Sequence, residues 1–241
     1  LISKFKKAFA VLATVALVST NVPIAFAQTF NDVATDHWAF DYVEQLVDEG
    51  VFDVADNFRP GDALNRAELV KIVITAVDGL AGYEAPATPT FDDVAADAWF
   101  FDYVEAAVQL DIVAGYTDAK GNLTGKFGPS DTVNRAQATK ILVNAFGVAT
   151  TLEPAAPFSD VPESAWFYEY VTTAYNQSIL DGYDNGKFGP ADPVTRAQVA
   201  KLVVNSQDPV LRVAEGEEEE AAEGEEEAAA GEEEAAAGEE E

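Results

Sequence analysis

Apolar and polar positions along the chain follow one pattern that occurs three times. In the first block of each copy, aromatic and aliphatic residues recur at near-helical spacing, which predicts an amphipathic helix. The positions are Trp38, Tyr42, Val43 and Leu46, then Trp99, Tyr103, Val104 and Ala107, then Trp166, Tyr170, Val171 and Ala174. In the second block, residues 69–77 carry a similar apolar stripe. A lone pair of helices cannot enclose such stripes, so we expect the three copies to share one core in an all-α, roughly three-fold arrangement.

A short polar motif opens the second block of each copy. It consists of a side-chain acceptor, an arginine, an alanine and then Glu or Gln, as in Asn65-Arg66-Ala67-Glu68, Asn134-Arg135-Ala136-Gln137 and Thr195-Arg196-Ala197-Gln198. An acceptor three residues before Glu or Gln, followed by an apolar run, is the pattern of a capping box. The sequence therefore predicts three helices that begin in the same way.

Each of these helices carries an arginine at its first position. A positive charge gains nothing from the helix dipole there, whereas free N–H groups at a helix start attract anions. One interpretation is that an anion lies near Arg66, Arg135 and Arg196. The alternative is that each arginine lies along the surface and pairs with a local carboxylate, but the repeated placement favours the anion.

The spacing within each block is constant, and the segment between the blocks varies. A Phe-x-Asp-Val motif begins each copy at Phe30, Phe91 and Phe158, and another phenylalanine precedes each arginine by eight residues, at Phe58, Phe127 and Phe188. The distance from the first-block tyrosine to this second phenylalanine is 16, 24 and 18 residues. Constant blocks joined by a variable segment indicate two helices connected by a surface loop.

Charge and composition limit the classes of partner. The formal net charge is −29, and most of residues 215–241 are glutamate. Such a chain would repel nucleic acid and anionic lipid. Glu, Ala and Gly at this charge density predict an acidic, largely disordered tail over 208–241. No cysteine is present, so disulfides do not contribute to stability.

The first 27 residues have the features of a secretory signal peptide. Lys4, Lys6 and Lys7 precede an apolar run, and Ala25-Phe26-Ala27 provides small residues at a cleavage site. The apolar run is too short to span a bilayer. We expect an exported protein that begins near Gln28 and has no membrane span once the signal is cleaved.

Several residue types receive structural interpretations. The tryptophans lie on apolar stripes, which favours packing in the core over contact with a ligand. The one histidine, His37, lacks the partners for a metal site or a catalytic triad, and no cofactor is expected. Lys71, Lys140 and Lys201 are five positions past their arginines, about 140° round a helix, so they do not share a face with them. A solvated surface is favoured for these lysines, and the alternative is a secondary contact to a ligand from a neighbouring unit. No two carboxylates are marked as a glycosidase pair.

Taken together, the repeated motifs resemble those of the S-layer homology domain. The resemblance covers positions 28–207 and rests on Phe-x-Asp-Val, the tryptophan, Gly-Tyr before Phe-x-Pro, and Thr-Arg-Ala-Gln or its Asn variants. It implies repeats at 28–85, 90–149 and 157–207, packed as a pseudo-three-fold spindle around a central helical bundle. It also implies a secreted protein of the cell wall or S-layer.

The resemblance further implies a non-catalytic function. In that family, grooves between repeats bind an anionic, typically pyruvylated, cell-wall polysaccharide linked to peptidoglycan. The implied binding residues are Arg66, Arg135 and Arg196 with the Gly-Tyr pairs Gly115, Tyr116, Gly182 and Tyr183. The first copy departs from the pattern, because Val54-Ala55 stands in place of Gly-Tyr. Two alternatives stay open: a structural S-layer subunit that self-assembles, and the anchoring part of a wall-processing enzyme.

Overall fold

The computed structural model describes residues 28–207, which form six α-helices and no β-strand. The predicted signal peptide and acidic tail lie outside this range. The helices are α1 (Phe40–Asp48), α2 (Arg66–Ala76), α3 (Phe101–Gln109), α4 (Arg135–Ala145), α5 (Tyr168–Asn176) and α6 (Arg196–Ser206). Two helices thus come from each sequence unit, and the all-α prediction is confirmed.

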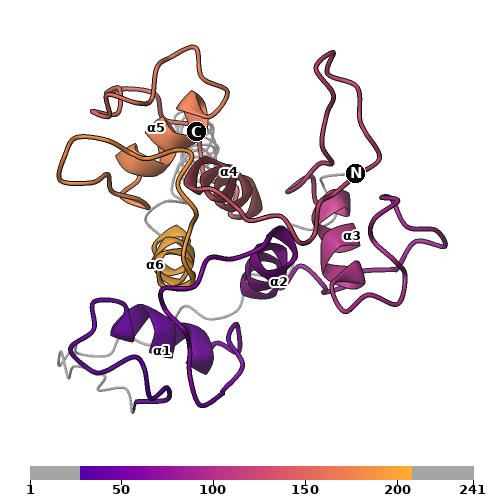
Figure 1. Ribbon diagram of the computed structural model, residues 1–241, viewed down its shortest axis with the longest axis horizontal. Coiled ribbons are helices and arrows are strands. Elements are labelled where there is room, and N and C mark those ends of the chain that lie inside the picture. Colours follow the sequence, from indigo (N-terminus) through magenta and orange to yellow (C-terminus); the bar gives the residue numbers. More distant parts are fainter. Residues whose placement is uncertain (1–27, 208–241) are drawn as a thin grey trace, which may run out of the picture.

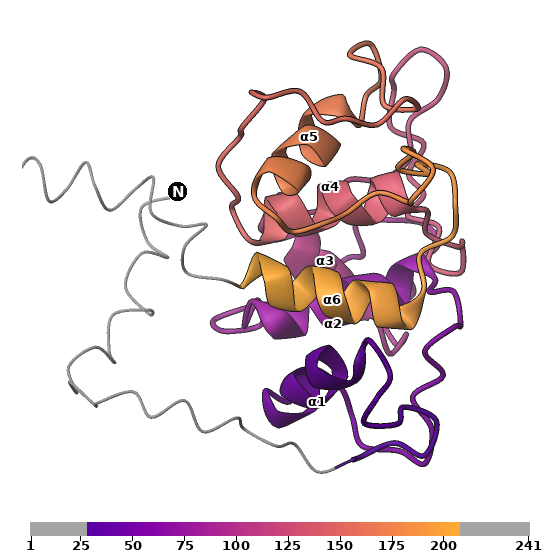
Figure 2. The same ribbon diagram turned by 90° about the vertical axis from the view of Figure 1, so that its left-hand side faces the viewer.

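The three second-block helices form the centre of the molecule. Helices α2, α4 and α6 contact one another, and α1, α3 and α5 lie outside them (Figure 1). Figure 2 shows α2, α4 and α6 side by side. Each outer helix packs on the central helix of the preceding unit: α3 on α2, α5 on α4, and α1 on α6. The first and last units are therefore joined directly, and the pseudo-three-fold spindle stays a prediction.

Burial on several faces distinguishes the central helices from the outer ones. In α2, Leu69, Val70, Val73 and Ile74 are all completely buried, although a single amphipathic stripe would bury only some of them. The reason is that α2 contacts α3 on one side and the other two central helices on others. Figure 1 shows this position between neighbours.

Each central helix begins with the predicted capping box. In α2 the Asn65 side chain accepts a hydrogen bond from the Glu68 backbone N–H, and the Glu68 side chain accepts one from Asn65. The boxes at Asn134 and Thr195 are formed in the same way. The helix starts are thereby confirmed by their cap geometry.

The segments just before these helices are joined in a closed ring of backbone hydrogen bonds. Leu64 N–H donates to Val194 at 3.2 Å, Val194 donates to Val133 at 3.0 Å, and Val133 donates to Leu64 at 3.0 Å. Because the ring uses one residue from each unit, it fixes the three helix starts relative to one another. Each arginine lies two residues after the ring residue of its unit.

The Phe-x-Asp-Val motif fastens the turn that precedes each central helix. The Asp93 carboxylate accepts the backbone N–H groups of Phe127 and Gly128 at 2.8 and 2.9 Å. The Phe91 ring packs on Phe127 with centroids 5.5 Å apart. Asp32 and Asp160 hold the equivalent turns. None of the helices within residues 28–207 has the length and apolar character needed to cross a membrane.

Candidate functional site

The Arg66 side chain is held between two aromatic rings of the second unit. Its Nε donates to the Phe127 carbonyl oxygen at 2.8 Å, and its guanidinium carbon lies 4.7 Å from the centroid of the Phe127 ring and 4.8 Å from that of Tyr116. The residue is only 6% exposed. Within residues 28–207 its side chain makes no other hydrogen bond to protein, so both terminal Nη groups are left for a ligand.

The other two arginines are held in a similar way, Arg135 by the third unit and Arg196 by the first. Arg135 Nε donates to Phe188 at 2.8 Å, and its guanidinium lies over Tyr183 and Phe188. Arg135 also donates through Nη2 to the Asp181 carbonyl at 3.0 Å. Arg196 Nε donates to Phe58 at 2.7 Å, which joins the last unit to the first.

Each arginine lines a groove to which all three units contribute. We call these grooves A, B and C. Groove A, of about 420 Å³, contains Arg66 from the first unit, Gly115, Tyr116, Gln137 and Lys140 from the second, and Trp166 from the third. Groove B, of about 210 Å³, contains Arg135, Asp181, Gly182, Tyr183, Gln198, Lys201 and Trp38. Groove C, of about 320 Å³, contains Arg196, Phe52, Asp53, Glu68, Lys71 and Trp99.

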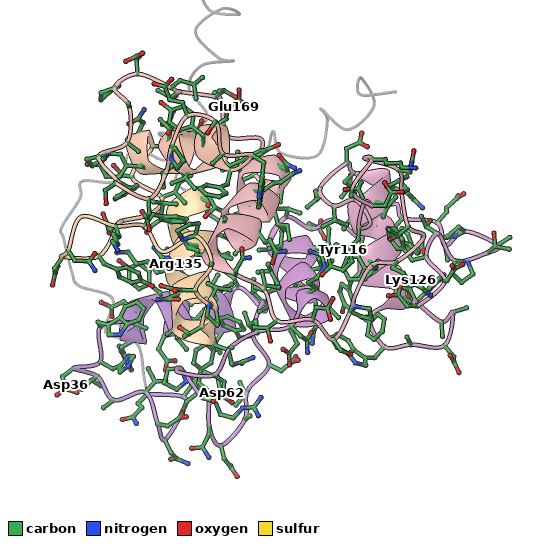
Figure 3. All side chains as sticks on the ribbon, turned by 45° about the horizontal axis from the view of Figure 1, so that its top comes forward. Asp36, Asp62, Tyr116, Lys126, Arg135 and Glu169 are labelled. Carbon is green, nitrogen blue, oxygen red and sulfur yellow. The ribbon has the colours of Figure 1, made fainter. Side chains whose placement is uncertain are left out.

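The predicted Gly-Tyr pairs lie in grooves A and B, next to arginines of a different unit. The Tyr116 hydroxyl is 2.9 Å from Asp131, to which it donates, while its ring contacts the Arg66 guanidinium. In Figure 3, Tyr116 lies towards α2, and Lys126 lies farther out on the same loop. Groove C, which lacks the pair, belongs to Arg196 rather than Arg66. The tyrosine therefore positions the arginine and also lines the groove.

Glycine at position 115 is required by packing within the protein. A Cβ there would lie 2.6 Å from the Phe91 ring and 2.9 Å from the Lys126 carbonyl oxygen. Gly182 lies against Phe158 in the same way. Glycine at these two positions therefore lets the backbone lie close to the phenylalanine of the Phe-x-Asp-Val motif.

The helix-start argument for an anion requires a correction. The Arg66 and Ala67 backbone N–H groups donate to the carbonyls of Asp131 and Pro129, and the Glu68 N–H donates to its cap. These groups are therefore not available to an anion, and the attraction comes from side-chain charge and not from the start of the helix. The alternative of surface pairing with a carboxylate is also wrong, because Arg66 is buried and its protein partner is a carbonyl.

Burial has an electrostatic consequence for these arginines. It lowers the pKa of Arg66, while Tyr116 and Asp131 act in the opposite direction. Burial lowers the pKa of Arg135 in the same way. An arginine remains charged at neutral pH even so. Each groove therefore holds a partly desolvated cation whose attraction for an anion is screened less than that of an exposed one.

The prediction that the tryptophans pack in the core is wrong. Trp38, Trp99 and Trp166 are 55%, 57% and 57% exposed. The outer helices begin two residues later, at Phe40, Phe101 and Tyr168, so each tryptophan precedes its helix and does not share its buried face. Each one instead lines a groove, where its ring is available to a ligand.

The three lysines also line grooves, whereas we expected them on a solvated surface. The angle of about 140° between each arginine and its lysine is real, and it directs them into two different grooves. Lys140 thus faces Arg66 of the preceding unit and not Arg135. His37 accepts a hydrogen bond from the Ala39 backbone at 3.2 Å, consistent with a structural role.

Two kinds of groove residue, the tryptophans and the lysines, were not chosen as site residues from the sequence, because the structural interpretation was favoured for both. The tryptophans and lysines repeat at spacings as constant as those of the arginines, and that signal could have identified them. What could not be read was which units meet, because the outer helix of one unit packs on the central helix of another.

Comparison with known proteins agrees with the repeats. The S-layer homology domain family matches residues 29–70, 90–139 and 157–200. The surface-layer 125 kDa protein of Lysinibacillus sphaericus is 34% identical in an alignment of 209 positions that covers 82% of this chain and 17% of that protein. An S-layer protein of Bacillus thuringiensis subsp. finitimus is 28% identical in an alignment of 211 positions that covers 85% of this chain and 24% of that protein.

Enzymes carry similar segments. An endoglucanase of a Bacillus species is 30% identical over 118 residues, which are 49% of this chain and 12% of the enzyme. The chain thus spans less than a quarter of the length of each of these relatives. The family matches nevertheless cover more than half of the 241 residues. The chain belongs to the S-layer homology domain family, whose members lie at the surface of the cell envelope.

Proposed function

We propose that this chain is a non-catalytic anchor that binds an anionic cell-wall polysaccharide in grooves A, B and C. The observation that carries the proposal is the guanidinium in each groove, which is buried in grooves A and B and partly buried in groove C. It is fixed through Nε and an aromatic ring and retains at least one unbonded Nη group. Membership of the family and its surface-layer relatives support the same function.

The geometry suits a sugar that carries a carboxylate, such as a pyruvyl ketal. A guanidinium donates two parallel hydrogen bonds to a carboxylate, and each charged bond contributes about 1.5 to 3 kcal/mol. Because Arg66 is already held by Phe127 and Tyr116, little side-chain entropy is lost on binding. The exposed indole at the other side of each groove offers an aromatic face to the sugar ring.

Several grooves on one body allow several sugars of a polymer to be held at once. Once one groove is occupied, the remaining grooves meet the same polymer at a raised effective concentration. Weak binding of single sugars is therefore compatible with firm attachment to the wall, without any catalytic step.

The test is sedimentation of the purified protein with wall sacculi. We expect Arg66→Gln, Arg135→Gln and Arg196→Gln to weaken binding at the affected groove by about 10- to 100-fold each, and the triple variant to remain in the supernatant. Lys120→Gln, in the exposed 118–122 turn outside the groove linings, is the matched control for loss of one positive charge. Circular dichroism checks that each variant is folded.

Removal of the acidic substituents from the glycan provides the complementary test. We expect the unmodified protein to lose binding to sacculi treated in this way. Undiminished attachment of the folded triple variant, or equal binding to treated and untreated sacculi, would refute the proposal.

Surface-layer relatives favour a second candidate, a lattice subunit that self-assembles. Sedimentation of the protein without sacculi separates the two, because a lattice subunit pellets alone and an anchor does not. The endoglucanase relative raises the further alternative that this chain is the anchoring part of a wall-processing enzyme. The complete reading frame decides that question.

A further inference from the structure

The lysines of the three grooves differ in their partners. Lys71 forms an ion pair with Asp53 at 2.9 Å, and Lys201 forms one with Asp181 at 2.8 Å. The residue at the corresponding position of groove A is Ala114, and Lys140 has no carboxylate partner within residues 28–207. Its Nζ lies 5.3 Å from the ring centroid of Tyr170 and 6.0 Å from that of Trp166.

The capping-box residue adds to this difference. Position N3 of the central helix is Gln137 in groove A and Gln198 in groove B, but Glu68 in groove C. Every groove lining has two cations. They are accompanied by no carboxylate in groove A, one in groove B, and two in groove C.

Groove C has one more cation nearby, Arg59, which does not alter the order of the three grooves in net charge. Arg59 lies close enough to Arg196 to lower the pKa of that arginine, after the larger effect of burial. Its own charge is matched by Asp62 at 3.5 Å, and Glu68 acts on Arg196 in the opposite direction. Groove C therefore remains close to neutral.

We propose that groove A is the principal anion site of the protein, that Lys140 is its second cationic contact, and that affinity for an acidic saccharide falls from A to B to C. This inference rests on the proposed function and adds which groove binds first. Asp181 and Asp53 neutralise the lysines of grooves B and C and repel an incoming carboxylate. Groove A, whose lining holds two cations and no carboxylate, also suits a saccharide that bears two acidic groups.

Each change of one charge should alter affinity only modestly, because the lysines are partly exposed. Exposed charge pairs are weak, so we expect a two- to fivefold step in dissociation constant between successive grooves. Screening should reduce this difference as salt rises from about 20 mM to 0.5 M. A difference that came from groove shape alone would persist at high salt.

The three tryptophans allow each groove to be measured separately. The chain has three tryptophans, and one lines each groove: Trp166 in A, Trp38 in B and Trp99 in C. The indole N–H resonances of ¹⁵N-labelled protein can be assigned with Trp→Phe variants. They are then followed during titration with acidic oligosaccharides released from purified sacculi of Lysinibacillus sphaericus.

We expect the Trp166 resonance to shift at the lowest oligosaccharide concentration, followed by Trp38 and then Trp99. If all three shift together, or Trp99 shifts first, the ranking is overturned while the proposed function stands. If none shifts, the proposed function itself fails. Oligosaccharides without their acidic groups should bind too weakly to produce a measurable order among the three resonances.

Exchange of the carboxylate between grooves sharpens the test. Ala114→Asp should weaken binding at Trp166 two- to fivefold, and Asp181→Ala should strengthen binding at Trp38 by a similar factor, since both positions are exposed. Lys140→Gln should resemble Ala114→Asp, and Lys120→Gln should change neither signal. Equal effects of Lys140→Gln and Lys120→Gln would overturn the role of Lys140.

Discussion

In groove A the Arg66 guanidinium lies between two rings, 4.7 and 4.8 Å from their centroids. In groove C, Arg196 lies 4.6 Å from the Phe58 ring, but its second ring is Phe52 at 5.7 Å. The Nε hydrogen bond to a phenylalanine carbonyl is the same in both. The two grooves thus share the phenylalanine, whose carbonyl and ring fix the arginine. They differ in the second ring beside the guanidinium, which is Tyr116 in groove A and Phe52 in groove C.

The turn that contains this phenylalanine is likewise the same in one respect and different in another. Asp93 and Asp32 both accept two backbone N–H groups from this turn. The residue after the phenylalanine, however, is Gly128 in groove A and Arg59 in groove C, and both have a positive φ, of 74° and 60°. A side chain is admitted in groove C because Ala55 stands where Tyr116 stands in groove A. The comparison indicates that a side chain at the position of Arg59 requires the absence of the tyrosine.

Removal of the shared phenylalanine should produce the largest effect. Phe127→Ala is expected to lower the free energy of unfolding by about 3 to 5 kcal/mol, because this ring is completely buried. Phe58→Ala should cost a similar amount, since Phe58 is only 1% exposed. Urea denaturation measures both variants. If the losses in unfolding free energy of the two variants differ by more than about 2 kcal/mol, the two phenylalanines do not have equivalent structural roles.

Gly128→Ala should be the next largest, and it separates the two turns. The backbone at φ 74° disfavours any Cβ, and this one would meet Asp131 Oδ2, to which the Tyr116 hydroxyl donates, and lie 2.5 Å from the Tyr116 ring. Strain and overpacking together predict a loss of about 2 to 4 kcal/mol in unfolding free energy. In the double variant with Tyr116→Ala, which imitates groove C, much of that loss should be recovered. A double variant no more stable than Gly128→Ala would contradict the link between the two positions.

Asp93→Asn tests the carboxylate that both turns share. The asparagine retains one acceptor oxygen and loses the charge, so we expect a cost of about 1.5 to 3 kcal/mol at pH 7. Burial tends to raise the pKa of Asp93, but the N–H donors of Phe127 and Gly128 outweigh it, and the pKa is lowered. The contribution of Asp93 to stability is therefore complete above its unfolded pKa of about 3.9 and is lost as the pH falls through its lower folded pKa.

Stability measured from pH 6 to pH 2.5 checks the sign. The unmodified protein should lose stability below about pH 4, and Asp93→Asn should show a shallower decline over the same interval. Asp32→Asn should behave similarly, because the pKa of Asp32 is lowered by the corresponding donors of Phe58 and Arg59. If both variants lose stability with falling pH as steeply as the unmodified protein, the two carboxylates do not stabilise the fold through their charge.

Local features of the fold could be predicted because they depend on short-range chemistry. The capping boxes at Asn65, Asn134 and Thr195 were read from four residues each, and all three are formed. The three units and their all-α character followed from repeated spacing. The pairing of units could not be predicted, because apolar stripes indicate that a face is buried and not which helix covers it.

The grooves were predicted only in part for the same reason. Arg66 and Tyr116 were both proposed as site residues, but their contact crosses from one unit to the next. The tryptophan was assigned to the core because its spacing matches a helix that in fact begins two residues later. Helix boundaries are sensitive to such shifts, and a shift of two residues moves a side chain to the opposite face.

The smallest expected effect has the opposite sign and concerns the turn of groove C. Arg59→Gly should raise the free energy of unfolding by about 0.5 kcal/mol, because glycine adopts positive φ without the cost of a Cβ, while its greater freedom in the unfolded chain offsets part of the gain. The Arg59–Asp62 ion pair is 3.5 Å long between side chains that are 61% and 56% exposed, so its loss should cost little. Removal of Arg59 also relieves its repulsion of Arg196. Arg59→Ala, which removes the same charge but keeps a Cβ, is the matched control, and a gain equal to that of Arg59→Gly would attribute the effect to charge and not to the backbone.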